Sequence, residues 1–272
     1  MKAPSITLVV EDNLVNQQVM GLFLQQLNLQ VDFAANGQEA INSIHNRDYG
    51  IVFMDIEMPL MDGIEAAHRI RTQPDLVQQP YIIALTAHQD DLLDFYKERG
   101  FDALLVKPVT LQMIQSVFAL YLAGKTQEKS NKLQQYLSAT MPFDPDVLNQ
   151  MKENLGEESN SKLYGIVNTF IEYTPELLNN MVKAVECADW ETVRRNAHTL
   201  KSSSASMGVI HLSNQSASLE NKLCSRLSET INQNQASELL AEIKADLEDI
   251  YQSYDEACAN LIKYQKSLGV NS

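Results

Sequence analysis

Cysteines and long apolar runs are scarce in this chain, and each shortage excludes a class of protein. The three cysteines among 272 residues, Cys187, Cys224 and Cys258, lie far apart and form no CxxC or Cys/His cluster. Such an odd, scattered set indicates a reducing cytosol rather than a disulfide scaffold or a cysteine-based metal site. No apolar run approaches the roughly 18 residues of a membrane span, and the N-terminus is not a signal peptide. We therefore expect a soluble, cytoplasmic protein.

Positive charge is also in short supply. The chain holds 21 Lys and Arg against 35 Asp and Glu, a formal net charge of −14. Such a surface repels nucleic acid, so we do not expect the protein to bind DNA directly. The acidic excess is shared equally, because residues 1–124 and residues 143–266 each carry a net −8 (7 basic against 15 acidic, and 11 against 19). This division predicts two acidic domains.

The first 124 residues alternate between short apolar runs and segments with helical spacing. Strands are predicted at 6–10, 30–34, 51–54, 81–85 and 103–106. Helices are predicted at 14–27, through 40–44 after a turn at 36–37, and at 64–70, 92–99 and 111–122. Five βα repeats of this kind predict a doubly wound parallel sheet of five strands with helices on both faces. Functional sites in such folds gather beyond the carboxyl ends of the strands.

The remainder of the chain lacks strand-like alternation. Residues 125–142 are rich in Lys, Gln, Ser and Thr, and they are predicted to be a linker. Helices are predicted at 143–155, 160–188, 190–208, 209–226 and 232–263, with a kink at Pro175 in the second of them. Short connections between four substantial helices predict an antiparallel four-helix bundle over residues 143–266, followed by a tail at 267–272.

Polar side chains stand at four of the predicted strand ends. Glu11 and Asp12 follow the first strand, Asp55 the third, Thr86 ends the fourth and Lys107 the fifth. Because parallel strands end at one edge of the sheet, these groups should converge. Clustered carboxylates need a positive partner, and a hard oxygen-binding cation such as Mg²⁺ fits them. A cation, a lysine and a hydroxyl around one spare carboxylate oxygen favour phosphoryl transfer.

A second group of polar residues lies on the predicted helix 190–208. Val193, Ala197, Leu200, Ser204 and Met207 form its apolar stripe. His198, Lys201, Ser202 and Ala205 lie on another stripe about 100° away, so His198 is predicted to point outward. An exposed imidazole is a nucleophile towards phosphorus, and a neighbouring ammonium group would help to hold the product's charge.

Residues 4–123 resemble a response-regulator receiver domain, which has a flavodoxin-like fold. The resemblance rests on Val9-Val10-Glu11-Asp12-Asn13 with Asn16, on Met54-Asp55-Ile56-Glu57-Met58-Pro59-Leu60-Met61-Asp62-Gly63, and on Leu85-Thr86-Ala87 and Val106-Lys107-Pro108. It implies that Asp55 is the phospho-acceptor, and that Mg²⁺ is held by Glu11, Asp12, Asp55 and the backbone carbonyl of Glu57. It also implies that Thr86 is a switch hydroxyl, that Lys107 contacts the phosphate, and that the Lys107–Pro108 peptide is cis.

Residues 143–264 resemble a histidine phosphotransfer (Hpt) domain. Its signature His-x-x-Lys-Gly-Ser is similar to His198-Thr199-Leu200-Lys201-Ser202-Ser203. The resemblance implies that His198 is a second phospho-acceptor, assisted by Lys201.

Two positions depart from the patterns of these families. Leu104 stands where receivers usually have Tyr or Phe, and Ser202 stands where the Hpt signature has Gly. We expect the phosphorylation chemistry to persist, with a weaker or different conformational output. Transfer at His198 is expected to be slower or more selective.

These observations predict a two-component phosphorelay protein. The chain contains no glycine-rich nucleotide boxes, so an ATP-binding kinase domain is not predicted within it. Phosphate would come from a histidine kinase or from an upstream part of a longer hybrid kinase, and would pass between Asp55, His198 and the receiver domain of a partner. One alternative is a haloacid-dehalogenase-type phosphatase, since Asp55-Ile56-Glu57 resembles its Asp-x-Asp motif. Another is a binding module with a degenerate receiver. His88 is a candidate for the edge of the receiver pocket.

Overall fold

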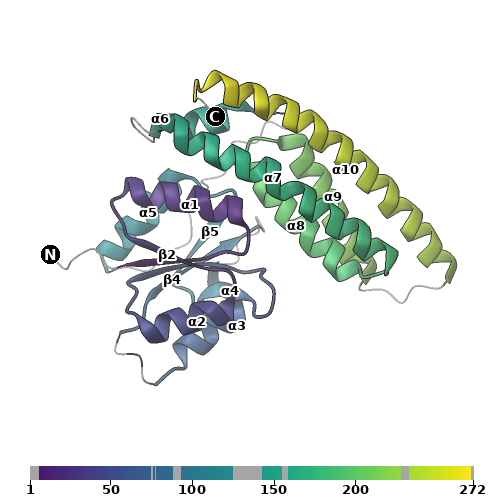
Figure 1. The fold of residues 1–272 in the computed structure, drawn as a ribbon. Helices are drawn as coiled ribbons and strands as arrows, with labels where there is room; N and C mark the ends of the chain where they lie inside the picture. The colour runs from purple at the N-terminus through teal and green to yellow at the C-terminus, as the bar shows by residue number, and fades with distance from the viewer. Residues whose placement is uncertain are drawn as a thin grey trace. The chain divides into compact units, whose positions relative to one another are not determined.

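The chain folds into two compact units. In the computed structural model, residues 6–74, 76, 78–87, 93–124, 143–154, 159–227 and 233–270 are described, and the units comprise Met1–Tyr136 and Leu137–Ser272. Figure 1 shows a sheet flanked by helices in the first unit and helices alone in the second. The predicted linker at 125–142 and His88 lie outside the described residues.

A parallel five-stranded sheet forms the centre of the first unit. Its strands are β1 (Thr7–Val10), β2 (Val31–Ala34), β3 (Ile51–Asp55), β4 (Tyr81–Thr86) and β5 (Ala103–Val106). They are ordered β2-β1-β3-β4-β5, and each neighbouring pair is parallel. The predicted doubly wound fold is therefore confirmed. Asp55 is the last residue of β3 rather than the first residue of the loop that follows, and Thr86 ends β4 as predicted.

Helices cover both faces of this sheet (Figure 1). Helices α1 (Leu14–Gln26) and α5 (Leu111–Leu122) lie on one face, and α2 (Gly37–Asn46), α3 (Gly63–Arg71) and α4 (Leu93–Lys97) lie on the other. Four of the five begin at a side chain that accepts a hydrogen bond from a backbone N–H group of the first turn; these residues are Asn13, Asn36, Asp62 and Thr110. Such capping satisfies donors that have no partner within the helix and fixes where each helix starts.

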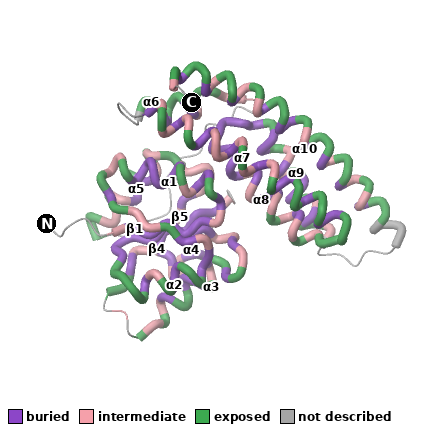
Figure 2. Tube along the Cα trace, in the orientation of Figure 1, coloured by how far each residue is buried: buried purple, intermediate pink, exposed green. Residues whose placement is uncertain are grey.

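The central strands β1 and β3 are buried because helices cover both faces of the sheet. Every residue of β1 and β3 is buried, which Figure 2 shows as the purple centre of the sheet. Large side chains such as Phe53 and Ile83 are at most 1% exposed. At about 25 cal/mol per Å² of apolar surface, burial of this kind is the main force holding the sheet and helices together. It leaves the strand ends as the place where polar groups can gather.

The second unit is a helical bundle. Its helices are α6 (Pro145–Asn154), α7 (Ser159–Glu186), α8 (Trp190–Ser206), α9 (Ile210–Leu227) and α10 (Gln233–Ser267). The last four pack against one another as the predicted antiparallel bundle (Figure 1). Helix α7 continues through Pro175, and Asp189 caps α8 by accepting a hydrogen bond from the backbone N–H of Thr192 at 3.1 Å. Each of these helices contributes buried residues, which Figure 2 shows as purple segments.

The end of α10 differs from its predicted end. The helix continues to Ser267, four residues beyond the predicted boundary at 263. Leu268 is 4% exposed, and its backbone carbonyl accepts a hydrogen bond from Asn160 Nδ2 at 2.7 Å. The side chain of this leucine gives the end of α10 an apolar contact that helical periodicity alone does not reveal.

The backbone of Gly63 lies very close to the backbone of Asp55, and a substitution at Gly63 can test whether this contact constrains the loop after β3. A Cβ atom at this position would lie 2.1 Å from the backbone carbonyl oxygen of Asp55. Gly63→Ala must therefore displace backbone, and we expect it to destabilise the first unit by about 1–3 kcal/mol, measured as the free energy of opening from amide hydrogen exchange in β1 and β3.

The matched control is Gly165→Ala in α7, where the added methyl group would meet no atom within 4 Å. Alanine is favoured over glycine inside a helix by about 0.5–1 kcal/mol, so this variant should be slightly stabilised. Equal effects of the two substitutions would show that the close approach at Gly63 does not constrain the loop.

Candidate functional site

The carboxyl edge of the sheet gathers three carboxylates. Glu11 and Asp12 follow β1, and Asp55 ends β3, which is paired with β1 in the sheet. One carboxylate oxygen from each of the three residues lies within 4.8 Å of the others. The adjacent strand ends predicted from the sequence are thus brought together. Three negative charges at this separation repel one another and require compensation by positive charge.

Lys107 supplies part of that compensation. It follows β5, and its Nζ lies 2.7 Å from Glu11 Oε2 and 2.8 Å from Asp55 Oδ2. Burial lowers the pKa of the Lys107 ammonium, but the charges of Asp55 and Glu11 raise it more strongly, so that the net shift is upward from its ordinary value. The lysine therefore stays charged and bridges the two acids. The Lys107–Pro108 peptide that follows is cis, as predicted.

Hydrogen bonds hold the remaining groups of this site. Asn16 Nδ2 donates to Glu11 Oε1 at 3.2 Å and orients that carboxylate. The backbone N–H of Glu57 lies 3.4 Å from Asp55 Oδ1, so the chain after β3 turns back towards the Asp55 side chain. Thr86 ends β4, the strand on the other side of β3, and its Oγ1 accepts a hydrogen bond from the hydroxyl of Tyr96 at 3.3 Å. No sequence motif indicates this role for Tyr96.

The loop after Asp55 is fixed by its backbone. The N–H of Gly63 donates to the carbonyl of Ile56 at 2.9 Å, and Leu60 adopts a left-handed conformation with φ of 68°. Asp62 Oδ1 accepts from the backbone N–H of Glu65 at 2.7 Å and starts α3. The Met-Pro and Asp-Gly steps of the sequence therefore build a closed loop that returns the chain to the sheet beside Asp55.

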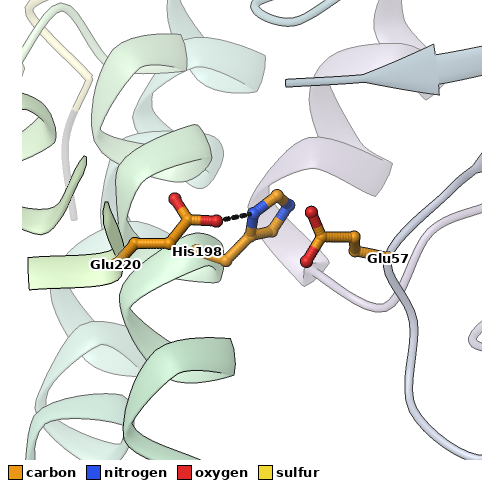
Figure 3. Close-up of side chains that lie close together, drawn as sticks. All are labelled: Glu57, His198 and Glu220. Atoms are coloured by element: carbon orange, nitrogen blue, oxygen red, sulfur yellow. Dashed lines mark hydrogen bonds and ion pairs between the residues drawn. The ribbon is translucent and has the colours of Figure 1, made fainter. Parts of the chain in front are cut away.

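The second unit holds a separate group of ionisable side chains around His198. His198 lies on α8, and its Nδ1 is 2.7 Å from Oε1 of Glu220 on α9 (Figure 3). The other oxygen of that carboxylate, Oε2, accepts a hydrogen bond from Lys201 Nζ at 2.6 Å. Glu220 is thus shared by the two residues that the sequence motif indicates.

Glu220 fixes the tautomer of the imidazole. Burial raises the pKa of the Glu220 carboxyl, but hydrogen bonds and charges from His198 and Lys201 lower it more, to about 2. At neutral pH the group is a carboxylate, which can only accept hydrogen bonds. Nδ1 of His198 must therefore carry the proton, so that Nε2 is the nitrogen of the neutral ring that bears the lone pair. In Figure 3 this second nitrogen is turned away from Glu220.

The prediction that His198 simply points outward needs a correction. Its ring lies against α9, because the Glu220 carboxylate draws Nδ1 towards that helix. Sequence periodicity does not reveal Glu220, which is 22 residues away and meets His198 only when α8 packs on α9. Ser202, which stands where the Hpt signature has Gly, turns its hydroxyl to its own helix and donates to the Thr199 carbonyl at 3.1 Å.

Comparison with family models identifies both units. Residues 7–119 match the response regulator receiver domain, and residues 165–253 match the Hpt domain. The chain thus contains a receiver domain followed by an Hpt domain, and this combination supports two-component phosphorelay signalling.

Several characterised proteins are similar to parts of the chain. The osmosensing histidine protein kinase SLN1 of Saccharomyces cerevisiae is 33% identical over 46% of this chain and 11% of its own length. The sensor protein TorS of Escherichia coli is 26% identical over 76% of this chain and 21% of its own length. The chain therefore spans about a tenth to a fifth of the length of these relatives.

A solved receiver domain, that of sensor histidine kinase PA1611 from Pseudomonas aeruginosa, is also similar, with 31% identity over 44% of this chain and 99% of that one, at a TM-score of 0.41. That structure has a magnesium ion coordinated in its active-site cleft.

No helix in the described part of the present chain is long and apolar enough to cross a membrane.

The ionised state of Glu220 should contribute to the stability of the bundle in a pH-dependent way. Its folded pKa of about 2 lies below the ordinary 4.5, so its contribution is present above about pH 4.5 and is lost as the pH falls towards 2. We expect Glu220→Gln to lower the free energy of unfolding at pH 7 by about 3 kcal/mol, and this difference to shrink progressively below pH 4.5.

Trp190, the single tryptophan of the chain and the first residue of α8, reports on this unit by fluorescence during urea unfolding. Glu248→Gln, at an exposed position of α10, is the matched control and should change the free energy of unfolding by less than about 0.5 kcal/mol. A wild-type advantage over Glu220→Gln that stays constant from pH 7 to pH 3 would contradict the assignment.

Proposed function

We propose that this protein carries a phosphoryl group on two residues in turn, Asp55 of the receiver domain and His198 of the Hpt domain. The observation that carries the proposal is the cluster of Glu11, Asp12 and Asp55, with Lys107 bridging two of its members. Such an arrangement suits a site at which further negative charge arrives with a cation.

Mg²⁺ is the cation that fits this donor set. Carboxylate oxygens of Glu11, Asp12 and Asp55 lie close enough together to share one hard ion, and the backbone N–H of Glu57 lies 3.4 Å from Asp55 Oδ1. We assign the ligands to these three carboxylates and to the backbone carbonyl of Glu57. The ion supplies positive charge that neutralises phosphoryl oxygens and leaves coordination positions for them.

Phosphorylation of Asp55 needs positioning more than further chemistry. A carboxylate oxygen of Asp55 forms a bond to phosphorus while the P–N bond of a donor phosphohistidine breaks, and the leaving imidazole retains its electron pair and takes up a proton. Lys107 already bonds to Asp55, so its ammonium lies where a phosphoryl oxygen would need charge. Thr86, at the neighbouring strand end, is the hydroxyl assigned to donate to another phosphoryl oxygen.

Transfer at His198 uses the nitrogen that Glu220 does not hold. Nε2 attacks phosphorus of an aspartyl phosphate, the P–O bond to the carboxyl group breaks, and the carboxylate leaves with its electron pair. Glu220 keeps the proton on Nδ1 and balances the positive charge that the ring gains. Lys201, bonded to the other oxygen of Glu220, is one helical turn from the acceptor and is assigned to phosphoryl oxygens during transfer.

The partners follow from this chemistry. A histidine kinase, or a kinase domain upstream in a longer hybrid kinase, supplies the phosphoryl group to Asp55, and a partner receiver domain exchanges it with His198. The relay is reversible because acyl phosphate and phosphohistidine are both high-energy species.

We propose the domain limits 1–124 and 143–266 for the two modules. Three free cysteines, two of them exposed, are consistent with a cytoplasmic setting. The strongly acidic surface argues against direct DNA binding.

Asp55 and Mg²⁺ can be tested together with a small phosphodonor. When the protein is incubated with acetyl phosphate and Mg²⁺, we expect one phosphoryl group per chain at the receiver site, measured by intact mass. Asp55→Asn or removal of Mg²⁺ by EDTA should abolish this labelling, because the first removes the nucleophile and the second the charge that accommodates the phosphate. Glu57→Gln is the matched control, since only its backbone is assigned to the metal, and labelling should persist within about threefold.

Two outcomes would contradict the assignment. Labelling of Asp55→Asn at the wild-type level would place the receiver's phospho-acceptor elsewhere. Steady release of phosphate from a small phosphomonoester would favour the haloacid-dehalogenase-type phosphatase. That class places its nucleophile on the first strand, whereas Asp55 ends β3 after an acidic pair that follows β1.

A further inference from the structure

A hydrogen bond between two side chains connects Thr86, at the proposed phosphoryl site, to helix α4. It ends β4, and the register that pairs Asp55 with Leu85 puts Thr86 one residue beyond the level of Asp55 at the same edge of the sheet. Its Oγ1 accepts the hydrogen bond of Tyr96, whose hydroxyl lies 3.3 Å away. Tyr96 is the fourth residue of the five-residue helix α4.

The Tyr96 ring is held firmly on the inner side of that helix. The residue is 4% exposed, and its ring meets those of Phe95 and Phe101 edge-to-face, with centroids 5.2 Å and 5.7 Å away. A buried tyrosine hydroxyl normally requires a hydrogen-bond partner, and here the partner is a residue of the phosphoryl site. Moving Thr86 Oγ1 would therefore disturb α4, and moving α4 would disturb Thr86.

On the neighbouring strand β5, Leu104 stands where receivers usually have Tyr or Phe, so this position offers no hydroxyl to bind Thr86. Leu104 on β5 pairs with Ala84 of β4, and its apolar side chain packs against the core cluster that includes Tyr96. A leucine has no hydrogen-bonding side-chain group. The contact to Thr86 comes instead from α4, an element that precedes β5 in the chain.

We propose that Tyr96 is a positioning residue for Thr86, and that it couples the phosphoryl group on Asp55 to helix α4. This inference rests on the proposed function. Because Tyr96 donates to Thr86 Oγ1, it orients the threonine hydroxyl that is assigned to a phosphoryl oxygen, and hydrogen bonds arranged in series strengthen one another. The phosphoryl group thereby tightens the chain Tyr96–Thr86–phosphate, and α4 becomes more ordered.

Beryllium fluoride with Mg²⁺, a mimic of a phosphoryl group on a carboxylate, provides the test on the full chain. Loss of one hydrogen bond in the series predicts that Tyr96→Phe binds the mimic about two- to tenfold more weakly than wild type. Tyr121→Phe on α5, whose ring pairs with Tyr81 at a centroid distance of 5.6 Å, is the matched control and should bind as wild type does.

A double-mutant comparison separates positioning from a structural effect. Thr86→Val removes the hydroxyl through which Tyr96 is proposed to act, so the double variant Thr86→Val with Tyr96→Phe should bind no more weakly than Thr86→Val alone. In parallel, addition of the mimic should slow amide hydrogen exchange in α4 of the wild type, and this protection should be lost in Tyr96→Phe. A general packing defect would instead weaken binding additively and speed exchange with and without the mimic.

The outcomes distinguish this inference from the proposed function. If wild type binds the mimic and Tyr96→Phe shows the same affinity and the same protection of α4, the role of Tyr96 is refuted while the phosphoryl site stands. If wild type and Tyr96→Phe both fail to bind the mimic, the proposed function and the inference fall together. Additive losses in the double variant also overturn the inference, because Tyr96 would then act independently of Thr86.

Discussion

The ion pairs from Lys107 to Asp55 and Glu11 are the interaction on which the receiver site depends. Without them, the end of the sheet would hold neighbouring carboxylates whose repulsion opposes folding. The lysine neutralises part of that charge and leaves the cluster still acidic enough for a divalent cation. The sheet makes this possible because its parallel strands deliver Glu11, Asp55 and Lys107 to one edge from three distant parts of the sequence.

The Hpt site also depends on the compensation of charge, but there one acidic group lies between two basic side chains. There, one carboxylate, Glu220, is compensated by an imidazole and an ammonium. Its low pKa keeps it ionised, and its ionised state decides which nitrogen of His198 carries the proton. In both domains, therefore, ion pairs surround the group that we propose as the phospho-acceptor. The proposed acceptor of the receiver is a carboxylate oxygen, and the proposed acceptor of the Hpt domain is a nitrogen of an imidazole whose tautomer is set by its neighbour.

Much of this arrangement can be predicted from the sequence because it follows from short-range pattern. Alternating βα segments fix the order of the strand ends, so the sequence alone places Glu11, Asp12 and Asp55 together, and Lys107 with them. Glu220 and Tyr96 cannot be found in this way. Glu220 reaches His198 only through the packing of α8 on α9, and Tyr96 reaches Thr86 only through the placement of a five-residue helix. Neither residue belongs to a local motif, and their roles depend on tertiary contacts that periodicity does not encode.

The most direct test of a two-site relay is to locate the phosphoryl groups. The chain is charged with phosphoramidate and Mg²⁺ and quenched in parallel in acid and in alkali, because acyl phosphates are lost in alkali and phosphohistidine is lost in acid. The phosphorylated residues are then mapped by mass spectrometry. We predict phosphate on Asp55 after the acid quench and on Nε2 of His198 after the alkaline quench. Phosphate on any other residue in place of these two, or on Nδ1 of His198, would contradict the account.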